Sequence, residues 1–361
     1  MELTKIIIKK IEKEGPISFY DFMEMALYYP VLGYYNREKE HIGPEGDYYT
    51  SATFSPVFGV MIAKQIEEMW HHMGEKRFSI LEYGAGTGAL SNAILEYLKS
   101  NKDLYAGLSY HIIEKGAAMQ KKQRSLLNEK VSWYDTAEKL PKITGCVLSN
   151  ELVDNFAVHR VVMEEELKEV FVGYDYGFVE ILKPASPELK NYFTELKVDL
   201  PKGLKAEVNL DAKKWMKEIA TTLKKGYVLT IDYGSSSAEL YSEAGKNGTL
   251  KCYNKHTVNY HPYTCIGEQD ITSHVNFSAL CLWGHKNGLG FCGFTDQRRF
   301  LSSLGFRNHL KKTEASEDPY KNYLREVSLT NTLLEDMGDK FKVLIQHKAA
   351  PENELSGLSI M

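Results

Sequence analysis

The residues best suited to chemistry lie in the stretch ILEYGAGTGAL, residues 80–90. Gly84, Gly86 and Gly88 follow a short apolar run, and apolar residues then recur at helical spacing. Glycines let the backbone take positive φ and let a ligand approach the main chain closely. The helix start beyond them offers unpaired N–H groups. A strand, a glycine turn and a helix in this order predict a nucleotide-type site at the C-terminal edge of an α/β sheet.

Two ligand classes compete for this turn. Gly84, Gly86 and Ala89 loosely match the dinucleotide pattern G-x-G-x-x-G/A. Glu82 with the three glycines gives E-x-G-x-G-x-G, which resembles the first motif of S-adenosylmethionine methyltransferases. A carboxylate repels an anionic pyrophosphate and attracts the cationic sulfonium and amino groups of S-adenosylmethionine. Glu82 therefore favours the methyl donor, and a nicotinamide-dependent oxidoreductase remains the alternative that Ala89 permits.

Acidic residues end two further apolar runs. The stretch 108–116 reads as a strand that ends in Glu114, and the stretch 131–141 as a strand that ends near Asp135. An acidic residue at the end of the second strand commonly accepts hydrogen bonds from ribose hydroxyls, although acids also favour helix N-termini without any ligand. Both residues are predicted to contact the cofactor.

A parallel sheet must position these residues. Strand-like runs alternate with helical stretches, which indicates an α/β fold; the later runs are 145–156, 226–235 with Asp232 at its end, 289–295 and 341–348. The chain is predicted to divide into a helical N-terminal cap over 1–75, a core over 76–350 with insertions at about 160–225 and 235–275, and a loose tail over 351–361.

The segment before the glycine turn is unusual. Residues 2–14 predict an amphipathic helix, and Ser18 with Asp21 suits a capping box for a second helix. A loop rich in glycine and aromatics follows over residues 33–56, and long loops of this kind are more often functional than idle. Asp47 and Ser51 in this loop are predicted to fold over the cofactor as part of a lid.

Composition excludes several classes of protein. The 361 residues are 43% hydrophobic and 25% charged, as in an ordinary globular enzyme. A net charge of -4 provides no basic field for nucleic acid. No apolar run is long enough for a membrane span, and the N-terminus lacks the apolar core of a signal peptide. Five widely spaced cysteines favour a reduced compartment, so the predicted location is cytoplasmic.

Five blocks in order make the resemblance specific. The chain resembles the MidA-type family of S-adenosylmethionine-dependent protein methyltransferases, which includes bacterial members and the mitochondrial complex I assembly methyltransferase. The blocks are FMEMALYYPVLGYY with GDYYTSATFSPVFG, the glycine turn with Glu82, SNELVDNFAVHR, EVNLDAKKWMKEIATTLKKGYVLTIDYG, and CYNKH with IGEQDITSHVNFSAL and the later Gln297, Phe300, Leu301 and Gly305. They span residues 17 to 305. Asn155, Phe156 and Asn276 depart from the family's pattern.

The resemblance implies a class I methyltransferase fold, Rossmann-like with a mostly parallel sheet, and S-adenosyl-L-methionine as the cofactor. It also implies methyl transfer to a protein side chain, most often arginine, with a link to assembly of a respiratory complex. A guanidinium has a pKa above about 12 and must lose a proton during transfer. Glu151 and Asp154 are predicted to hold it by bidentate hydrogen bonds, and Asn150 to contact the methyl-transfer centre. The alternative is that residues 150–154 simply cap the following helix.

Asp270, Thr272 and His274 lie in the fifth block and are predicted to line the substrate channel. His274 or His256 is a candidate proton acceptor. Two rivals to protein methylation stay open: a cofactor-binding assembly chaperone with little turnover, and a small-molecule methyltransferase. The protein substrate is not identified, and the oligomeric state is open, a dimer included.

Four soft ligands cluster within residues 252–265, namely Cys252, His256, His261 and Cys265. Four such ligands can make a structural zinc site. Their spacing matches no standard zinc module, and the family resemblance implies no metal. The prediction is therefore a site without metal.

Overall fold

The computed structural model describes residues 2–37, 43, 46–47, 49–127, 130–313 and 318–359. The chain divides into two compact units, each assembled from separate stretches of sequence. Unit 1 comprises Met1–Tyr48, Val153–Met216 and Gly234–Trp283, and unit 2 comprises Tyr49–Leu152, Lys217–Tyr233 and Gly284–Met361.

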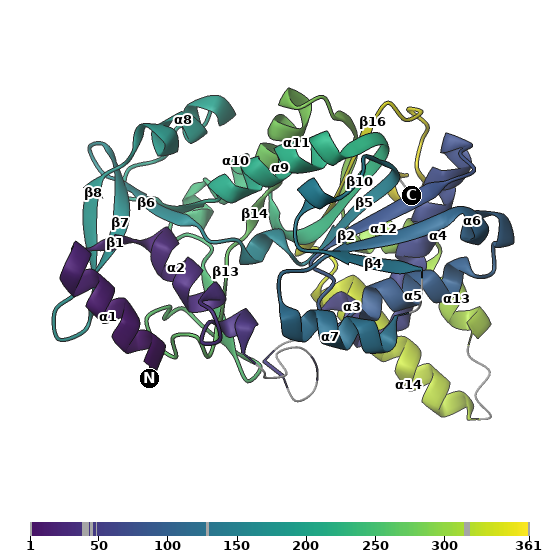
Figure 1. Ribbon diagram of the computed structural model, residues 1–361, viewed down its shortest axis with the longest axis horizontal. Helices are drawn as coiled ribbons and strands as arrows, with labels where there is room; N and C mark the ends of the chain where they lie inside the picture. Colours follow the sequence, from purple (N-terminus) through teal and green to yellow (C-terminus); the bar gives the residue numbers. More distant parts are fainter. Residues whose placement is uncertain are drawn as a thin grey trace. The chain divides into compact units, whose positions relative to one another are not determined.

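Unit 2 is built on a mostly parallel sheet (Figure 1). The strand order is β15-β16-β10-β5-β2-β3-β4, and β16 is antiparallel to both of its neighbours. The strands are β2 (Phe78–Tyr83), β3 (Leu108–Ile113), β4 (Val131–Tyr134), β5 (Ile143–Asn150), β10 (Leu223–Ser235), β15 (Gly290–Asp296) and β16 (Phe341–Lys348). The strands β2 and β5 are buried on both faces over most of their length, as parallel strands covered by helices must be. The predicted α/β sheet is confirmed.

The strand order reverses between β2 and β5, because β3 and β4 follow on one side and β10 on the other. Open α/β sheets bind ligands at such a switch point, beyond the carboxyl ends of the strands. The glycine turn follows β2, and Asn150 is the last residue of β5. The glycine turn and the segment that begins at Asn150 therefore lie on the two sides of the switch point.

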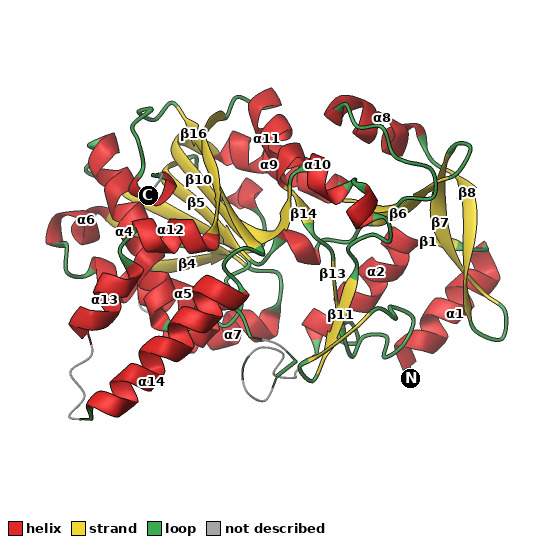
Figure 2. Ribbon diagram, turned by 180° about the vertical axis from the view of Figure 1, so that it is seen from behind, coloured by secondary structure: helices red, strands yellow, loops and turns green. Residues whose placement is uncertain are grey.

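Helix α4 (Pro56–Met73) follows the predicted start signals. The Ser55 hydroxyl accepts a bond from the Val57 N–H, Pro56 occupies the first turn, and Gly74 ends the helix in the left-handed region. Helix α4 lies beside α5 (Ala89–Leu98) so closely that a Cβ at Gly59 would meet the Cβ of Ala93 at 2.5 Å (Figure 2). The other helices of unit 2 are α3 (Ser51–Phe54), α6 (Lys102–Gly107), α7 (Ala117–Leu126), α12 (Gln297–Ser303), α13 (Phe306–Thr313) and α14 (Pro319–Thr330), followed by the π-helical turn Asn331–Asp336.

Unit 1 contains an antiparallel sheet in the order β1-β7-β6-β9, with β8 paired to β7. Its strands are β1 (Ile17–Ser18), β6 (His159–Met163), β7 (Leu167–Tyr174), β8 (Phe178–Pro184) and β9 (Lys205–Val208). Helix α1 (Glu2–Glu14) buries Leu3, Ile7 and Ile11 at four-residue spacing, and Ser18 caps α2 (Phe19–Tyr28) by accepting the Asp21 N–H. The same core cluster contains residues of α1, α2 and β7.

The remaining elements of unit 1 come from later stretches of chain. A small sheet, in the order β12-β11-β13, is formed by β11 (Lys251–Asn254), β12 (Thr257–Asn259) and β13 (Asp270–Thr272). The other elements are α8 (Pro187–Leu196), α9 (Leu210–Thr222), α10 (Ser237–Leu240), β14 (Val275–Asn276) and α11 (Phe277–Lys286); α9 and α11 end in stretches assigned to unit 2.

Two predicted boundaries differ from the structure. Residues 49–73 of the predicted N-terminal cap belong to unit 2, because α4 buries Phe58, Ile62 and Ile66 in the core of that unit. The predicted loose tail is wrong for residues 351–359, because Leu355 is buried and the Ser356 N–H and hydroxyl both donate to the Glu68 carboxylate.

Candidate active site

The glycine turn has the predicted backbone. Gly84, Gly86 and Gly88 all lie in the left-handed region, with φ of 65°, 53° and 83°. A Cβ at Gly84 would meet Cδ1 of Leu152 at 2.6 Å, so the turn packs directly against the segment that follows β5. The turn and residues 150–152 are therefore direct neighbours.

Gln123 on α7 ties the turn to the ends of β3 and β4. Its amide donates to the Gly86 carbonyl at 2.8 Å and to Glu114 Oε2 at 3.2 Å, and its oxygen accepts the Trp133 indole N–H at 2.9 Å. Glu114 stands directly after β3, where the Gly116 N–H donates to its Oε1, and burial raises the pKa of its carboxyl group. Sequence reasoning missed Gln123, because no pattern marks a buried glutamine in a helix.

Glu82 is bound by hydroxyl groups of two neighbouring elements. Its side chain is buried, and Oε2 accepts hydrogen bonds from the hydroxyl groups of Ser91 and Tyr110. Burial raises the pKa of its carboxyl group. These contacts join β2, β3 and α5 beneath the turn, so the structure gives Glu82 a bracing position, and its direct contact with a ligand stays a prediction.

Asp135 lies on the surface and pairs with a lysine. Its carboxylate is exposed and pairs with Lys139 Nζ at 2.7 Å, and this hydrogen bond lowers the pKa of Asp135. An exposed i,i+4 pair of this kind is an ordinary solvated contact. Its predicted cofactor contact therefore has no support from the described geometry.

Glu151 is held on a bend at the end of β5. Its backbone has φ of 50°, which is unusual for a residue other than glycine. Oε1 accepts the Ser51 N–H at 2.9 Å and the Asn150 amide at 3.2 Å. Burial, with the negative charge of Asp232 as a smaller cause, raises the pKa of the Glu151 carboxyl group to about 8. Strained residues and carboxyl groups with perturbed pKa values concentrate at functional sites.

The Ser51 N–H donates to Glu151 Oε1, and its hydroxyl lies 3.4 Å from Gln297 Oε1, so the predicted cofactor contact of Ser51 stays a prediction. Asp154 lies in unit 1, in the short helix Val153–Asn155, and its side chain is buried. Its carbonyl accepts the Ser273 N–H. The guanidinium contact of Asp154 stays a prediction.

Two of the predicted site residues in unit 1 are buried aspartates: Asp47 from the predicted lid and Asp270 from the predicted substrate channel. Tyr34 donates to Asp47 Oδ2 at 3.0 Å and the Lys255 N–H to Asp47 Oδ1 at 2.8 Å, so Asp47 fastens the loop to the β11–β12 turn. Tyr35 donates to Asp270 Oδ1 at 2.8 Å. Burial, and to a smaller degree the Asp47 charge, raises the pKa of Asp270 to about 7. Residues 38–42, 44–45 and 48 of the predicted lid lie outside the described residues.

Thr272 and His274 follow Asp270 on the same segment. Thr272 is buried, and the His274 N–H donates to the Thr249 hydroxyl at 3.0 Å. Burial, with a smaller effect from Lys251, lowers the pKa of His274 to about 4. An imidazole with this pKa accepts protons poorly at neutral pH, so the predicted role of His274 as a base gains no support.

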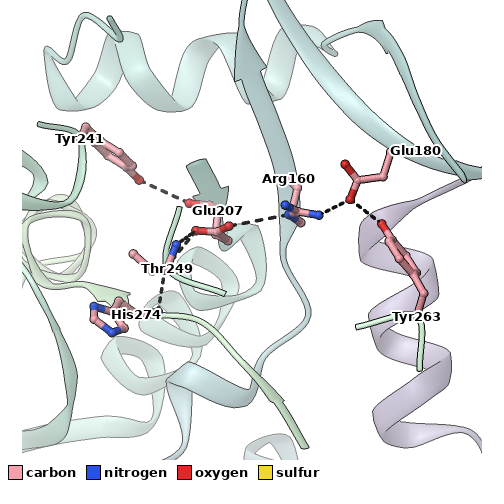
Figure 3. A network of polar contacts seen from close by, with 7 residues as sticks. All are labelled: Arg160, Glu180, Glu207, Tyr241, Thr249, Tyr263 and His274. Carbon is pink, nitrogen blue, oxygen red and sulfur yellow. Dashed lines mark hydrogen bonds and ion pairs between the residues drawn. The ribbon is translucent and has the colours of Figure 1, made fainter. Parts of the chain in front are cut away.

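A polar network connects this segment to the antiparallel sheet of unit 1 (Figure 3). Glu207 Oε2 accepts the N–H and hydroxyl of Thr249, and its Oε1 lies 3.8 Å from Nε of Arg160. The Arg160 guanidinium also pairs with Glu180 at 2.5 Å. Arg160 is therefore a largely buried cation, with 12% of its side chain exposed, between two carboxylates.

Replacing Arg160 with methionine is expected to destabilise the protein by about 3 kcal/mol, because it strands Glu207 without its cation. The urea midpoint would measure this loss. The matched control is Lys202→Met, which breaks an exposed pair with Glu165 and is expected to cost under about 1 kcal/mol. Equal midpoints for the two variants would contradict a structural role for this network.

The four soft ligands of residues 252–265 do not gather. Cys252 is buried in a core cluster, whereas Cys265 is exposed. Within the described ranges, no group of three or more His, Cys, Asp or Glu side chains is arranged to hold a metal ion.

Comparison with known proteins now adds to this geometry. A family model described as "Putative S-adenosyl-L-methionine-dependent methyltransferase" matches residues 61–295, most of the chain. The chain belongs to this methyltransferase family. A Burkholderia thailandensis protein, crystallised with S-adenosyl-homocysteine, is 27% identical, with a TM-score of 0.89 over 99% of this chain and 94% of that one. The methyltransferase therefore uses S-adenosyl-L-methionine and has the class I fold.

Curated relatives extend the comparison over nearly the whole length. The methyltransferase is 26% identical to "Protein arginine methyltransferase NDUFAF7, mitochondrial" of Bos taurus, over 95% of this chain and 82% of that protein. It is 25% identical to the Danio rerio protein of the same name, over 88% and 80% of the two chains. Their names place those proteins in mitochondria, so the predicted cytoplasmic location gains no support from them. None of the helices described here combines the length and apolar composition needed to cross a bilayer.

The residues at the switch point fit S-adenosyl-L-methionine. Asn150 Oδ1 is buried and accepts no hydrogen bond from the described part of the chain, so it can accept one from a ligand N–H. The three glycines of the turn carry no side chains, and Glu114 follows β3, a position from which acidic residues commonly bind a ribose. The turn and Glu114 therefore stay the predicted cofactor-binding residues, with Asn150 predicted at the methyl-transfer centre.

Replacing Gln123 with leucine is expected to weaken binding of S-adenosylhomocysteine about tenfold, because the freed Gly86 carbonyl and Trp133 N–H loosen the turn. Isothermal titration calorimetry would measure the affinity. The control is Gln120→Leu on the same helix, since the Gln120 amide donates to the Glu114 carbonyl, whereas the Gln123 amide donates to the Gly86 carbonyl. If both variants lose affinity equally, Gln123 has no special part in shaping the turn.

Proposed function

We propose that this methyltransferase transfers a methyl group to arginine side chains of proteins. The observation that carries the proposal is Glu151, a carboxyl group held on a strained bend beside the glycine turn, through the contact of Gly84 with Leu152. The names of the relatives, protein arginine methyltransferases, support the same substrate. The link to assembly of a respiratory complex stays a prediction from the family resemblance.

The protein itself has few chemical tasks in this reaction, because the methyl donor is already activated. Bound S-adenosyl-L-methionine supplies a methyl group already activated on a positively charged sulfur. The protein must position the guanidinium, exclude water and take away one proton. Glu151 can do two of these tasks, because an ionised carboxylate holds a guanidinium by two parallel N–H···O bonds and can then accept the proton that it loses.

The raised pKa of Glu151 suits this sequence of events. With a pKa of about 8, the carboxyl group is largely protonated at neutral pH before substrate arrives. A cationic guanidinium nearby favours the ionised form, so binding releases the proton. After transfer, a carboxylate with a high proton affinity accepts the proton from the methylated product more readily than one with an ordinary pKa.

Incubating the enzyme with a methyl-labelled donor and a mixture of cellular proteins and metabolites tests the proposal. We expect label in the acid-precipitated protein, and its loss in Glu151→Gln. Label in the soluble small-molecule fraction alone would indicate a small-molecule methyltransferase. Binding of S-adenosylhomocysteine without any label transfer would favour the cofactor-binding assembly chaperone.

A further inference from the structure

Asp232 is a completely buried carboxylate near the end of β10 that the proposed chemistry does not use. Its Oδ1 accepts the Tyr233 N–H at 2.9 Å, and its Oδ2 accepts the Leu152 N–H at 3.1 Å. The second bond crosses from β10 to the segment that leaves β5. Asp232 therefore binds the residue directly after Glu151.

Glu151 needs such a restraint. The left-handed region costs an L-residue about 1–2 kcal/mol and persists only when neighbouring contacts impose it. The Glu151 N–H donates to the Ile231 carbonyl at 2.9 Å, and the next N–H, that of Leu152, donates to Asp232. Both peptide groups around the Glu151 α-carbon are thus fixed by residues 231 and 232 of β10.

We propose that Asp232 is a positioning residue that holds Glu151 in its bend, so that the Glu151 carboxyl group faces the substrate guanidinium in a fixed orientation. This inference rests on the proposed function, since it names the residue through which Glu151 is set for that reaction. An aspartate is suited to the task because its two oxygens accept two N–H groups at once, whereas an asparagine can accept only through one oxygen.

The charge of Asp232 gives it a second effect on the same group. Besides burial, which raises the Glu151 pKa most, the Ser51 N–H of α3 and the Asn150 amide of β5 lower it, and the negative charge of Asp232 on β10 raises it. Removing that charge while keeping the side-chain shape must therefore lower the pKa of Glu151.

The test is Asp232→Asn, read first on the protein without cofactor or substrate. Carbon-13 NMR of labelled glutamate, with Glu151→Gln to assign the signal, gives the Glu151 pKa in both backgrounds. We expect it to fall, and the acidic limb of the pH–activity profile to move down with it. We also expect kcat to fall about tenfold to a hundredfold, because the carboxyl group is misplaced.

The matched control is Asp296→Asn, which alters the cap of α12 in the same unit and should leave the Glu151 pKa unchanged. If Asp232→Asn does not fold, Asp232→Ser, which keeps one acceptor and no charge, replaces it. An unchanged Glu151 pKa and an unchanged kcat in a folded variant would overturn the inference. Because the NMR reading needs no substrate, a shifted pKa in an enzyme that methylates no arginine would refute the proposed function separately.

Discussion

Replacing Glu151 with glutamine is expected to reduce methyl transfer by about a hundredfold or more, with binding of S-adenosylhomocysteine within about threefold of wild type. Glutamine keeps the shape of the side chain but neither pairs with a guanidinium as an anion nor accepts its proton. Single-turnover rates with a labelled donor would measure the loss, and calorimetry the binding. A variant that transfers methyl groups at the wild-type rate would exclude Glu151 from the chemistry.

The same variant is also expected to change how the free energy of unfolding depends on pH. The folded state raises the Glu151 pKa from 4.5 to about 8, so between these values the native chain holds a proton that the unfolded chain has lost. Stability therefore falls as pH rises through this window. Glutamine does not titrate, so Glu151→Gln does not show this loss. Its stability relative to wild type should therefore rise by a few kcal/mol between pH 5 and pH 8. Melting temperatures at these two pH values check this, and a constant offset would contradict the raised pKa.

Replacing Gly86 with valine is expected to abolish the thermal stabilisation that S-adenosylhomocysteine gives the wild-type protein. Gly86 has φ of 53°, where a β-branched residue is strained, and its side chain would stand where the backbone meets the ligand. A ligand that binds only the native state raises the melting temperature by mass action. Differential scanning fluorimetry with and without S-adenosylhomocysteine measures the effect.

The control for backbone strain is Gly74→Val in the same unit. Gly74 has φ of 62° at the end of α4, and a Cβ there meets no other atom within 4 Å. Gly74→Val is expected to lower the melting temperature and to keep the full ligand-induced shift. A preserved shift in Gly86→Val would remove the cofactor from this turn.

The sequence predicts those features of the fold that depend on residues close together in the chain. The strands and the glycine turn follow from apolar runs and from three glycines at alternate positions, since each feature depends on residues close in the chain. Glu151 was predicted as a site residue because the carboxyl ends of parallel strands are where such sheets bind ligands, and its role stays a prediction. The family resemblance added the methyl donor and the protein substrate.

The features that sequence missed depend on partners far along the chain. The Glu82 carboxylate accepts hydrogen bonds from Tyr110, 28 residues away, and from Ser91. Ser51 reaches Glu151 across 100 residues, and Asp232 reaches Leu152 across 80. A residue type and its place after a strand do not say which of these partners it will meet, because that depends on how strands and helices pack.

The most direct test of the account is the identity of the methylated atom. Acceptor proteins labelled by the enzyme would be digested and sequenced by tandem mass spectrometry, with Glu151→Gln as the parallel sample. We expect a single added methyl mass on arginine guanidino groups with the wild-type enzyme and none with the variant. Methylation of lysine or carboxyl side chains, or arginine methylation that persists in Glu151→Gln, would contradict the proposed site.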